Sequence, residues 1–159
     1  MPVTPTSSLA KALDNCKSLI AATPAFQAWG SFADAAAAKA NIHLFAVDQL
    51  ARPLIVLGVN EYDRTKIAEP NTYQERGAFE LLIEGLVPAE LTATNGDAAI
   101  DFMNKAGAVI DDILALAGTG SYLVIRSIVP AAGPFRSEEE VKAAEGDFFQ
   151  WFLTLKWGN

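Results

Sequence analysis

The sequence predicts an α+β domain: an antiparallel or mixed sheet of about five strands, with an N-terminal helix and one long helix packed on it. Helical periodicity occurs near the start and the middle of the chain, and the β-like segments run consecutively instead of alternating strictly with helices. A doubly wound parallel sheet would need that alternation. At 159 residues and 51% hydrophobic content, a single domain over residues 1–159 is long enough to bury a core without disulfides or metal.

The first forty residues predict helices. Ser7 or Ser8 can cap a first helix, which Thr23-Pro24 ends; the same pair can begin a second, short helix, because proline is tolerated at the first helical position. Asp34 precedes an alanine run over 35–40, which is either a third short helix or a loop. The first helix carries an apolar stripe of Leu9, Leu13, Cys16, Leu19 and Ile20.

Strand-forming residues dominate the next part of the chain. Segments 42–47 and 53–59 are separated by a short polar break and could pair, and 78–87 reads as a third strand. Its core face is expected to carry Phe79, Leu81 and Ile83. Residues 60–77 between them are polar and charged and are predicted to be a long loop, which usually means function or disorder.

A long helix is predicted over residues 98–117, with Gly118 and Gly120 as its C-terminal stop. A strand over 122–129, ended by Pro130, and a second polar span over 131–146 follow. The predicted helical stripe that faces the core is Ile100, Met103, Ala106, Val109 or Ile110, Ile113 and Leu114.

The chain ends on its most hydrophobic stretch, 148–157, which alternates with period two and is predicted to be a strand. One face should be clamped against the long helix, and Phe148 and Phe152 on the other face need a second cover, either a helix or a neighbouring subunit. One face carries Phe149, Trp151, Leu153, Leu155 and Trp157, and the first four of these are the predicted core face.

Composition disfavours several classes of partner. The formal net charge is -7 and the basic residues are scattered, which disfavours specific nucleic acid binding. The N-terminus lacks the features of a signal peptide, and no run of about 18 apolar residues is present, so a soluble protein without membrane contact is expected. Cys16, the single cysteine, is interpreted as a buried, inert thiol.

No catalytic, cofactor-binding or metal-binding residue is predicted. His43 is the only histidine, so a zinc site or a Cys-His pair cannot be assembled from the usual ligands. Asp111 and Asp112 point about 100° apart on a helix and are interpreted as solvated. The acidic run 138–140 lacks the spacing of a calcium loop and is interpreted as solvated or facing a partner, and an enzyme is not expected.

The layout of the chain resembles the phage tail terminator, or head-to-tail joining (tail completion), family. The shared features are an N-terminal helix before the proline and aromatic break at 23–29, strands around a long charged loop, one long helix and a strand at 122–129. A Pro-Phe-Arg loop at 134–136 and a terminal strand ending Leu155-Lys156-Trp157 complete the resemblance, which spans nearly the whole chain.

The resemblance implies a virion protein of the tail or neck, assembled in the host cytoplasm and needing no cofactor. Such subunits form a homo-oligomeric ring, usually a hexamer, on the end of the tail tube. The ring stops tube polymerisation and presents a surface to the neck or head-connector protein. The two polar spans would then make the contacts with the tail tube protein and between subunits. The candidate interface residues are Arg64, Lys66, Glu69, Tyr73, Glu75, Arg76, Arg136, Glu138, Glu139 and Glu140.

Three other hypotheses remain open. The chain could be a different phage neck, tube or baseplate subunit. It could be a small-ligand-binding α+β domain with Trp151, Phe152 and Trp157 lining a pocket, although core packing of these aromatics is the better interpretation. A hydrolase built on Asp and Glu is the third, for which the sequence indicates no geometry.

Overall fold

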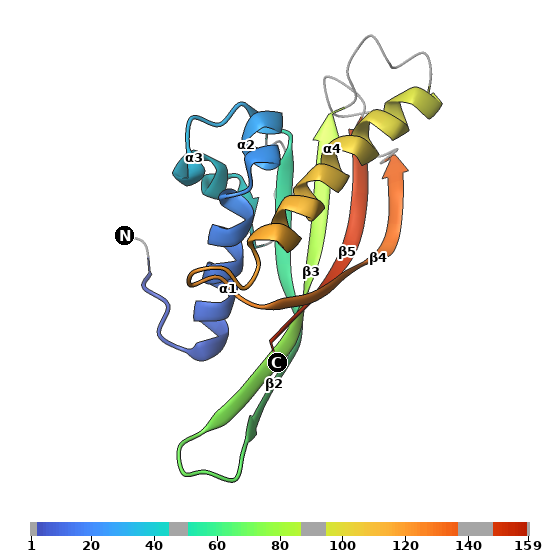
Figure 1. The fold of residues 1–159 in the computed structure, drawn as a ribbon. Helices are drawn as coiled ribbons and strands as arrows, with labels where there is room; N and C mark the ends of the chain where they lie inside the picture. Colours follow the sequence, from blue (N-terminus) through green and yellow to red (C-terminus); the bar gives the residue numbers. More distant parts are fainter. Residues whose placement is uncertain (1–2, 45–50, 87–94, 137–147, 159) are drawn as a thin grey trace.

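The computed structural model describes residues 3–44, 51–86, 95–136 and 148–158, and its fold is α+β with a mixed sheet. The helices lie on one face of the sheet (Figure 1). The strand order is β1-β2-β3-β5-β4, with β1 parallel to β2 and every other pair antiparallel. The elements are α1 (Ser8–Ala21), α2 (Pro24–Gly30), α3 (Ala35–Ala40), β1 (Ile42–His43), β2 (Leu54–Lys66), β3 (Tyr73–Leu86), α4 (Asn95–Leu116), β4 (Ile125–Arg136) and β5 (Phe148–Gly158).

Capping residues fix where the short helices begin. The Ser7 Oγ accepts a hydrogen bond from the Ala10 backbone N–H at 3.2 Å, which starts α1 as expected. The Asp34 carboxylate accepts from the Ala37 N–H at 2.8 Å, so the alanine run forms helix α3 and not a loop. None of the helices in the described ranges has the length and apolarity needed to cross a membrane.

The expected pairing of 42–47 with 53–59 is present but short. Ile42 and His43 pair in parallel with Ile55 and Val56, and residues 45–47 lie outside the described part of the chain. β5 lies between β3 and β4 over its whole length, so the chain terminus is clamped inside the sheet. The prediction of a terminal strand is therefore confirmed.

The two predicted polar loops are wrong at both ends of the first span and at the start of the second. Residues 60–66 and 73–77 continue β2 and β3, because cross-strand pairing extends along one long hairpin to Lys66 and Tyr73. β4 likewise continues through Pro130 to Arg136. Pro130 is tolerated because β4 is an edge strand with irregular register on both sides of the proline. Residues 137–146 of the second span lie outside the described residues.

Helix α4 has the predicted position, but its buried stripe is different from the predicted one. Ile100, Met103 and Leu114 are exposed, whereas Phe102, absent from the predicted stripe, is buried. Apolar residues cover more than half of the helix surface, so helical periodicity alone is consistent with two apolar stripes. Packing against the sheet buries one of these stripes and leaves the other exposed or partly buried. The residues that face the sheet are Ala98, Phe102, Ala106, Val109 and Ile113.

Aromatic contacts join α4, α2 and β5 in the core. The ring of Phe102 lies 5.5 Å from that of Phe149 and 5.8 Å from that of Trp29. On the predicted core face of β5, Phe149, Leu153, Leu155 and Trp157 are buried and Trp151 is partly buried. The expected clamp between the long helix and the terminal strand is confirmed.

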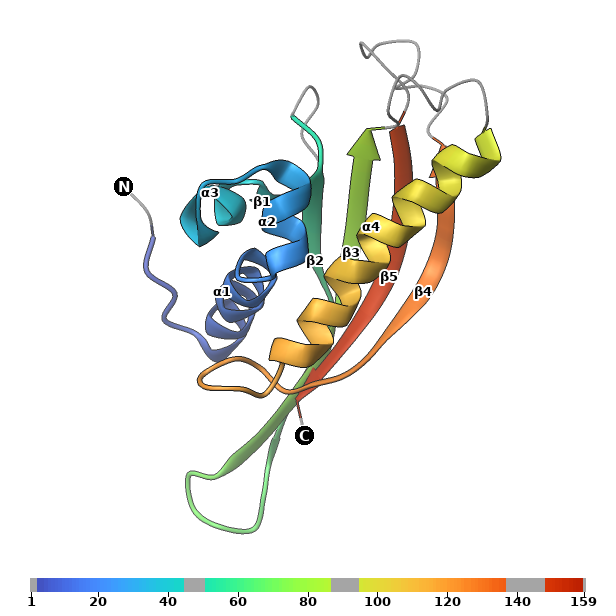
Figure 2. The same cartoon turned by 45° about the horizontal axis from the view of Figure 1, so that its top comes forward.

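The opposite face of the sheet carries an apolar row. Val56, Leu82 and Phe152 are aligned across β2, β3 and β5, and Phe152 is 39% exposed. Among the described residues, no helix covers this face (Figures 1 and 2). The second cover that Phe152 needs is therefore not supplied by the described part of the chain.

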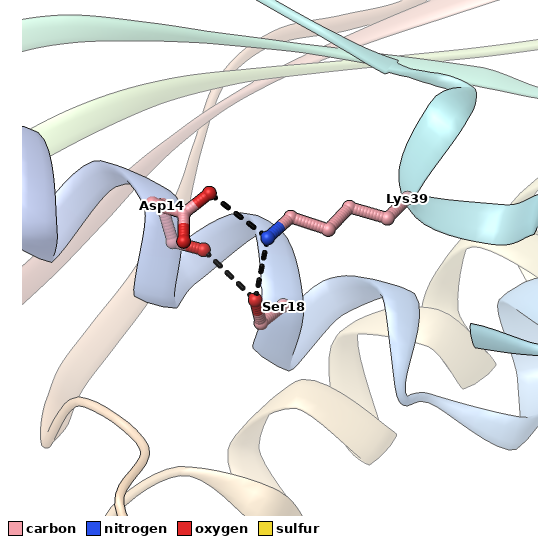
Figure 3. Close-up of polar contacts among 3 residues, drawn as sticks. All are labelled: Asp14, Ser18 and Lys39. Atoms are coloured by element: carbon pink, nitrogen blue, oxygen red, sulfur yellow. Dashed lines mark hydrogen bonds and ion pairs between the residues drawn. The ribbon is translucent and has the colours of Figure 1, made fainter. Parts of the chain in front are cut away.

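Polar contacts fasten the helical layer together. Lys39 on α3 binds the Asp14 carboxylate at 2.8 Å and donates to the Ser18 Oγ at 2.9 Å, which ties α3 to α1 (Figure 3). Asp112 accepts from the Ala25 N–H at 2.8 Å and so ties α4 to the start of α2. The interpretation of Asp112 as merely solvated is wrong, because α2 lies beside its carboxylate.

Candidate functional site

A charged hairpin arm projects from one end of the sheet. The arm is residues 64–75, the part of the β2–β3 hairpin beyond the last pair with β5, Arg76 with Gly158. It extends well past the helical layer (Figure 1). Its side chains are exposed or half-buried, including Ile67 at 43% and Tyr73 at 45%. The arm therefore adds nothing to the hydrophobic core of the described chain.

Cross-strand contacts join the two strands of the arm. The Arg64 Nε lies 3.2 Å from the Glu75 Oε1, and the Arg64 guanidinium carbon lies 4.2 Å from the centroid of the Tyr73 ring. The tip is closed by the Ile67 N–H donating to the Thr72 carbonyl at 3.1 Å. Exposed ion pairs of this kind contribute about 0.2–1 kcal/mol each, so they order the arm more than they stabilise the fold.

Two glycines let the strands meet at the base of the arm. A Cβ at Gly77 would collide with the backbone oxygen of Glu61, and Gly158 has a φ of +89° with the Glu75 backbone oxygen close by. Tyr62 stacks on Trp157 there, with ring centroids 6.2 Å apart. The base is therefore a close-packed junction between the arm and the core.

A polar cavity of about 450 Å³ lies beside this junction. Arg126 is the extra residue of a bulge in β4, and Asn60 forms a second bulge in β2; such bulges redirect side chains. Arg126 and Lys156 are exposed and form no ion pair within the described part of the chain. Their free cationic groups suit a carboxylate from a partner. The lining residues are Glu61, Tyr62, Asp63, Arg76, Gly77, Arg126 and Lys156.

The structure brings together only some of the predicted interface residues. Arg64, Lys66, Tyr73 and Glu75 lie on the arm, Glu69 lies in its turn and Arg76 lies at its base. Arg136 pairs with Phe149, at the opposite end of β5 from the arm. Glu138, Glu139 and Glu140 lie outside the described residues. Arg136 is thus separated from the arm by the length of the sheet.

Sequence reasoning missed Arg126 and Lys156 as parts of the same surface. Each lies in a largely apolar strand, and an isolated cation in such a strand is a signal that could have drawn attention to them. Their proximity depends on the register of β4 with β5, and on a bulge that no sequence pattern marks. The sequence could therefore suggest the residues but not the cavity.

Burial shifts the pKa of titratable groups outside this surface. Burial raises the pKa of the Cys16 thiol to about 12, so it stays protonated and unreactive. Burial, and then the nearby charge of Lys17, lower the pKa of His43. Within the described ranges, no three His, Cys, Asp or Glu side chains are grouped closely enough to hold a metal ion.

The aromatics proposed for a ligand pocket lie elsewhere. Trp157 is buried against Phe79, with ring centroids 5.4 Å apart, and none of Trp151, Phe152 and Trp157 lines the polar cavity.

A search with models of known protein families and a search of curated protein sequences both give no significant match for this chain.

Proposed function

We propose that this chain is a structural ring subunit of a phage virion, a tail terminator that closes the end of the tail tube. The ring halts tube polymerisation and provides the attachment surface for the neck or head connector. The observation that carries the proposal is the ordered, charged hairpin arm, which projects past the sheet and packs against no core. Its partners would be further copies of the chain, the tail tube protein and a neck or head-connector protein.

An exposed arm of this kind is costly for a protein to keep unless a partner covers it. An isolated two-stranded ribbon is marginally stable in water, and exposed Ile67 and Tyr73 gain nothing from solvent. An arm already held in one conformation loses little entropy when a partner binds it. A preformed arm with apolar and charged side chains is therefore suited to reach a neighbouring subunit.

The cavity at the base of the arm supports a head-to-tail contact. Arg126 and Lys156 can bind carboxylates of a neighbouring copy of the chain. A chain of net charge -7 carries many Asp and Glu carboxylates. Contacts between two different patches of identical subunits generate closed rings when the rotation closes. Charge complementarity of this kind sets register more than affinity.

The uncovered apolar row gives a second surface for assembly. Val56, Leu82 and Phe152 form a continuous strip across three strands on the face away from the helices. Burial of such a strip contributes about 25 cal/mol per Å². A ring neighbour or the tail tube would supply the cover that Phe152 lacks in the described chain.

Electron microscopy of the protein mixed with purified tail tubes tests the proposal. We expect a ring on one end of each tube and no further growth when tube protein is added. Rings elsewhere in the tail or neck would indicate another neck, tube or baseplate subunit. Bare tube ends at saturating protein would contradict the proposal.

A charge-reversal pair tests the role of the arm. Arg64→Glu should leave the monomer folded, because the Arg64–Glu75 pair is largely exposed, but should abolish capping. The double variant Arg64→Glu with Glu75→Arg restores the pair within the arm and is the matched control. If the double variant regains capping, Arg64 acts only within its own arm. If it does not, a partner contacts the charged side chains of the arm directly.

A further inference from the structure

Helix α4 carries more apolar surface than the sheet covers. Placed at 100° per residue, its sheet-facing side chains occupy about 80° of its circumference, and a second apolar stripe occupies about a further 80°. This second stripe, the free flank, lies mostly outside the core: Ile100 is 53% exposed, Leu114 44% and Met103 36%, while Ile110 is partly buried against the core. The free flank consists of Ile100, Met103, Gly107, Ile110 and Leu114.

The free flank lies on the side of α4 away from α2. Asp112, which contacts α2, lies on the other side of the sheet-facing stripe, whereas Phe102, which contacts Trp29, lies within that stripe. The helix runs obliquely over the sheet, with its N-terminal end on the β4 side (Figure 2). β4 contains Pro130 and has register shifts, which disfavour strand addition at this sheet edge. A helix is therefore a better occupant for this side than a strand.

Gly107, at the centre of the free flank, has no function within the described chain. Glycine inside a helix costs about 1 kcal/mol relative to alanine. A Cβ added at Gly107 would meet no atom within 4 Å, so nothing in the described chain requires its absence. Close approach of another backbone would require it, as at helix crossings where small residues bring two backbones together.

The sequence of the free flank is symmetric about Gly107. Ile100 lies seven residues before it and Leu114 seven after, while Met103 and Ile110 lie four before and three after. An antiparallel second copy of α4 would thus place Ile100 against Leu114 at both ends. Asn104 would lie beside the Asp111 carboxylate of the other copy, and both are exposed at the rim of the flank. A patch that matches itself in this way is the mark of an isologous two-fold contact.

We propose that two copies of this chain pair through α4, antiparallel and with Gly107 on the two-fold axis. The inference is independent of the proposed function, because a ring needs a head-to-tail contact between different patches. The apolar stripe from Ile100 to Leu114 is about 21 Å long, which is small beside the ~800 Å² per partner of a stable complex. The pairing is accordingly weak, in the micromolar range.

A cysteine placed on the axis tests the pairing. In Gly107→Cys, two thiols related by the two-fold axis lie within disulfide reach, and the native Cys16 is fully buried. Mild oxidation at micromolar protein should give a disulfide-linked dimer at least about tenfold faster than in Ala108→Cys, because pairing gives a millimolar effective concentration. Ala108 is the more exposed of the two positions, so random collision predicts the opposite order.

A second variant removes any dependence on disulfide chemistry. Gly107→Leu should shift the free protein from a concentration-dependent dimer to a monomer in sedimentation analysis, while Ala108→Leu leaves the dimer unchanged. Faster crosslinking of Ala108→Cys, or a wild-type protein that stays monomeric up to millimolar concentration, would overturn the inference. A wild-type dimer that Gly107→Leu leaves intact would also overturn it.

Discussion

At the scale of single residues, the fold depends on a few positions where burial or steric contact allows one kind of side chain. Cys16 is fully buried in α1, and the described chain places no cation or hydrogen-bond donor beside it that would stabilise its thiolate. Gly77 lies where two strands and an indole ring converge. Both positions have effects that can be measured without any knowledge of function.

Cys16 should be inert and should make stability fall at high pH. Its folded pKa of about 12 lies above the unfolded value of 9.0. As pH rises above 9, the unfolded chain loses the thiol proton first, so stability falls by about 1.4 kcal/mol per pH unit up to pH 12. Denaturant titrations of the wild type and Cys16→Ala should differ by this slope. A native thiol that reacts with a thiol reagent at pH 8 as fast as the unfolded chain would contradict the assignment.

Gly77→Ala should destabilise the subunit by about 1–3 kcal/mol. The added Cβ meets the Glu61 backbone oxygen and the Trp157 ring, neither of which can move without opening the junction. Gly58→Ala, in the neighbouring strand, is the matched control, because its Cβ would meet no atom within 4 Å. Urea denaturation gives both values, and equal changes in the two variants would refute the steric account.

At the scale of secondary-structure elements, side chains distant in sequence complete the ends of helices and loops. Thr23 precedes α2, but its hydroxyl donates to the Ile20 carbonyl and makes no side-chain cap. Asp112 on α4 supplies the acceptor at the start of α2 instead. Asn15 on α1 likewise binds the loop after α4, by donating to the Ser121 carbonyl and accepting from the Leu123 N–H.

Asp112→Ala should cost about 0.5–2 kcal/mol, the usual effect of losing an N-terminal cap. The loss leaves the Ala25 N–H without its acceptor and frees α2 from α4. Asp111→Ala is the control on the adjacent, exposed residue, and its effect should stay within about 0.5 kcal/mol. Thermal unfolding of the two variants measures the difference, and similar losses in both would argue against a cap by Asp112.

At the scale of the whole molecule, the sheet has one covered face and one that the described chain leaves open. Leu153 and Phe152 are neighbours on β5 but point to opposite faces, and their exposed fractions are 1% and 39%. The proposed ring, and the separate α4 pairing, place different surfaces against other subunits. Changes on these surfaces should therefore affect assembly and leave the folding of the subunit intact.

Leu153→Ala should destabilise the subunit by about 2–5 kcal/mol, whereas Phe152→Lys should change its stability by no more than about 1 kcal/mol. The first substitution opens a hole in the core, and the second places a charge on an open face. In the capping assay, Phe152→Lys should fail if, as proposed, a neighbouring subunit or the tail tube covers that face. A loss of stability as large as that of Leu153→Ala would show that the face is closed within the subunit.

Much of the fold could be predicted from local patterns. Ser7, Pro24 and Asp34 marked the starts of three helices, and alternation from 149 to 157 marked the terminal strand and its core face. The sequence marks the arm residues as a charged segment but predicts a loop there. Both faces of this ribbon carry polar residues, so the alternation of apolar and polar residues that is typical of a strand is absent. Arg136 was grouped with them, although the register places it at the other end of the sheet.

The sequence by itself determined the elements whose signals are local: caps, breaks, and periodicity over a single face. Only the tertiary structure decided which apolar stripe of α4 faces the sheet, because both Phe102 and Ile100 satisfy a helical period and packing against Phe149 selects the first. Strand register and a bulge in β4 likewise bring Arg126 and Lys156 to the same cavity. Contacts between residues far apart in the chain depend on how elements pack, and that information is not contained in any one segment.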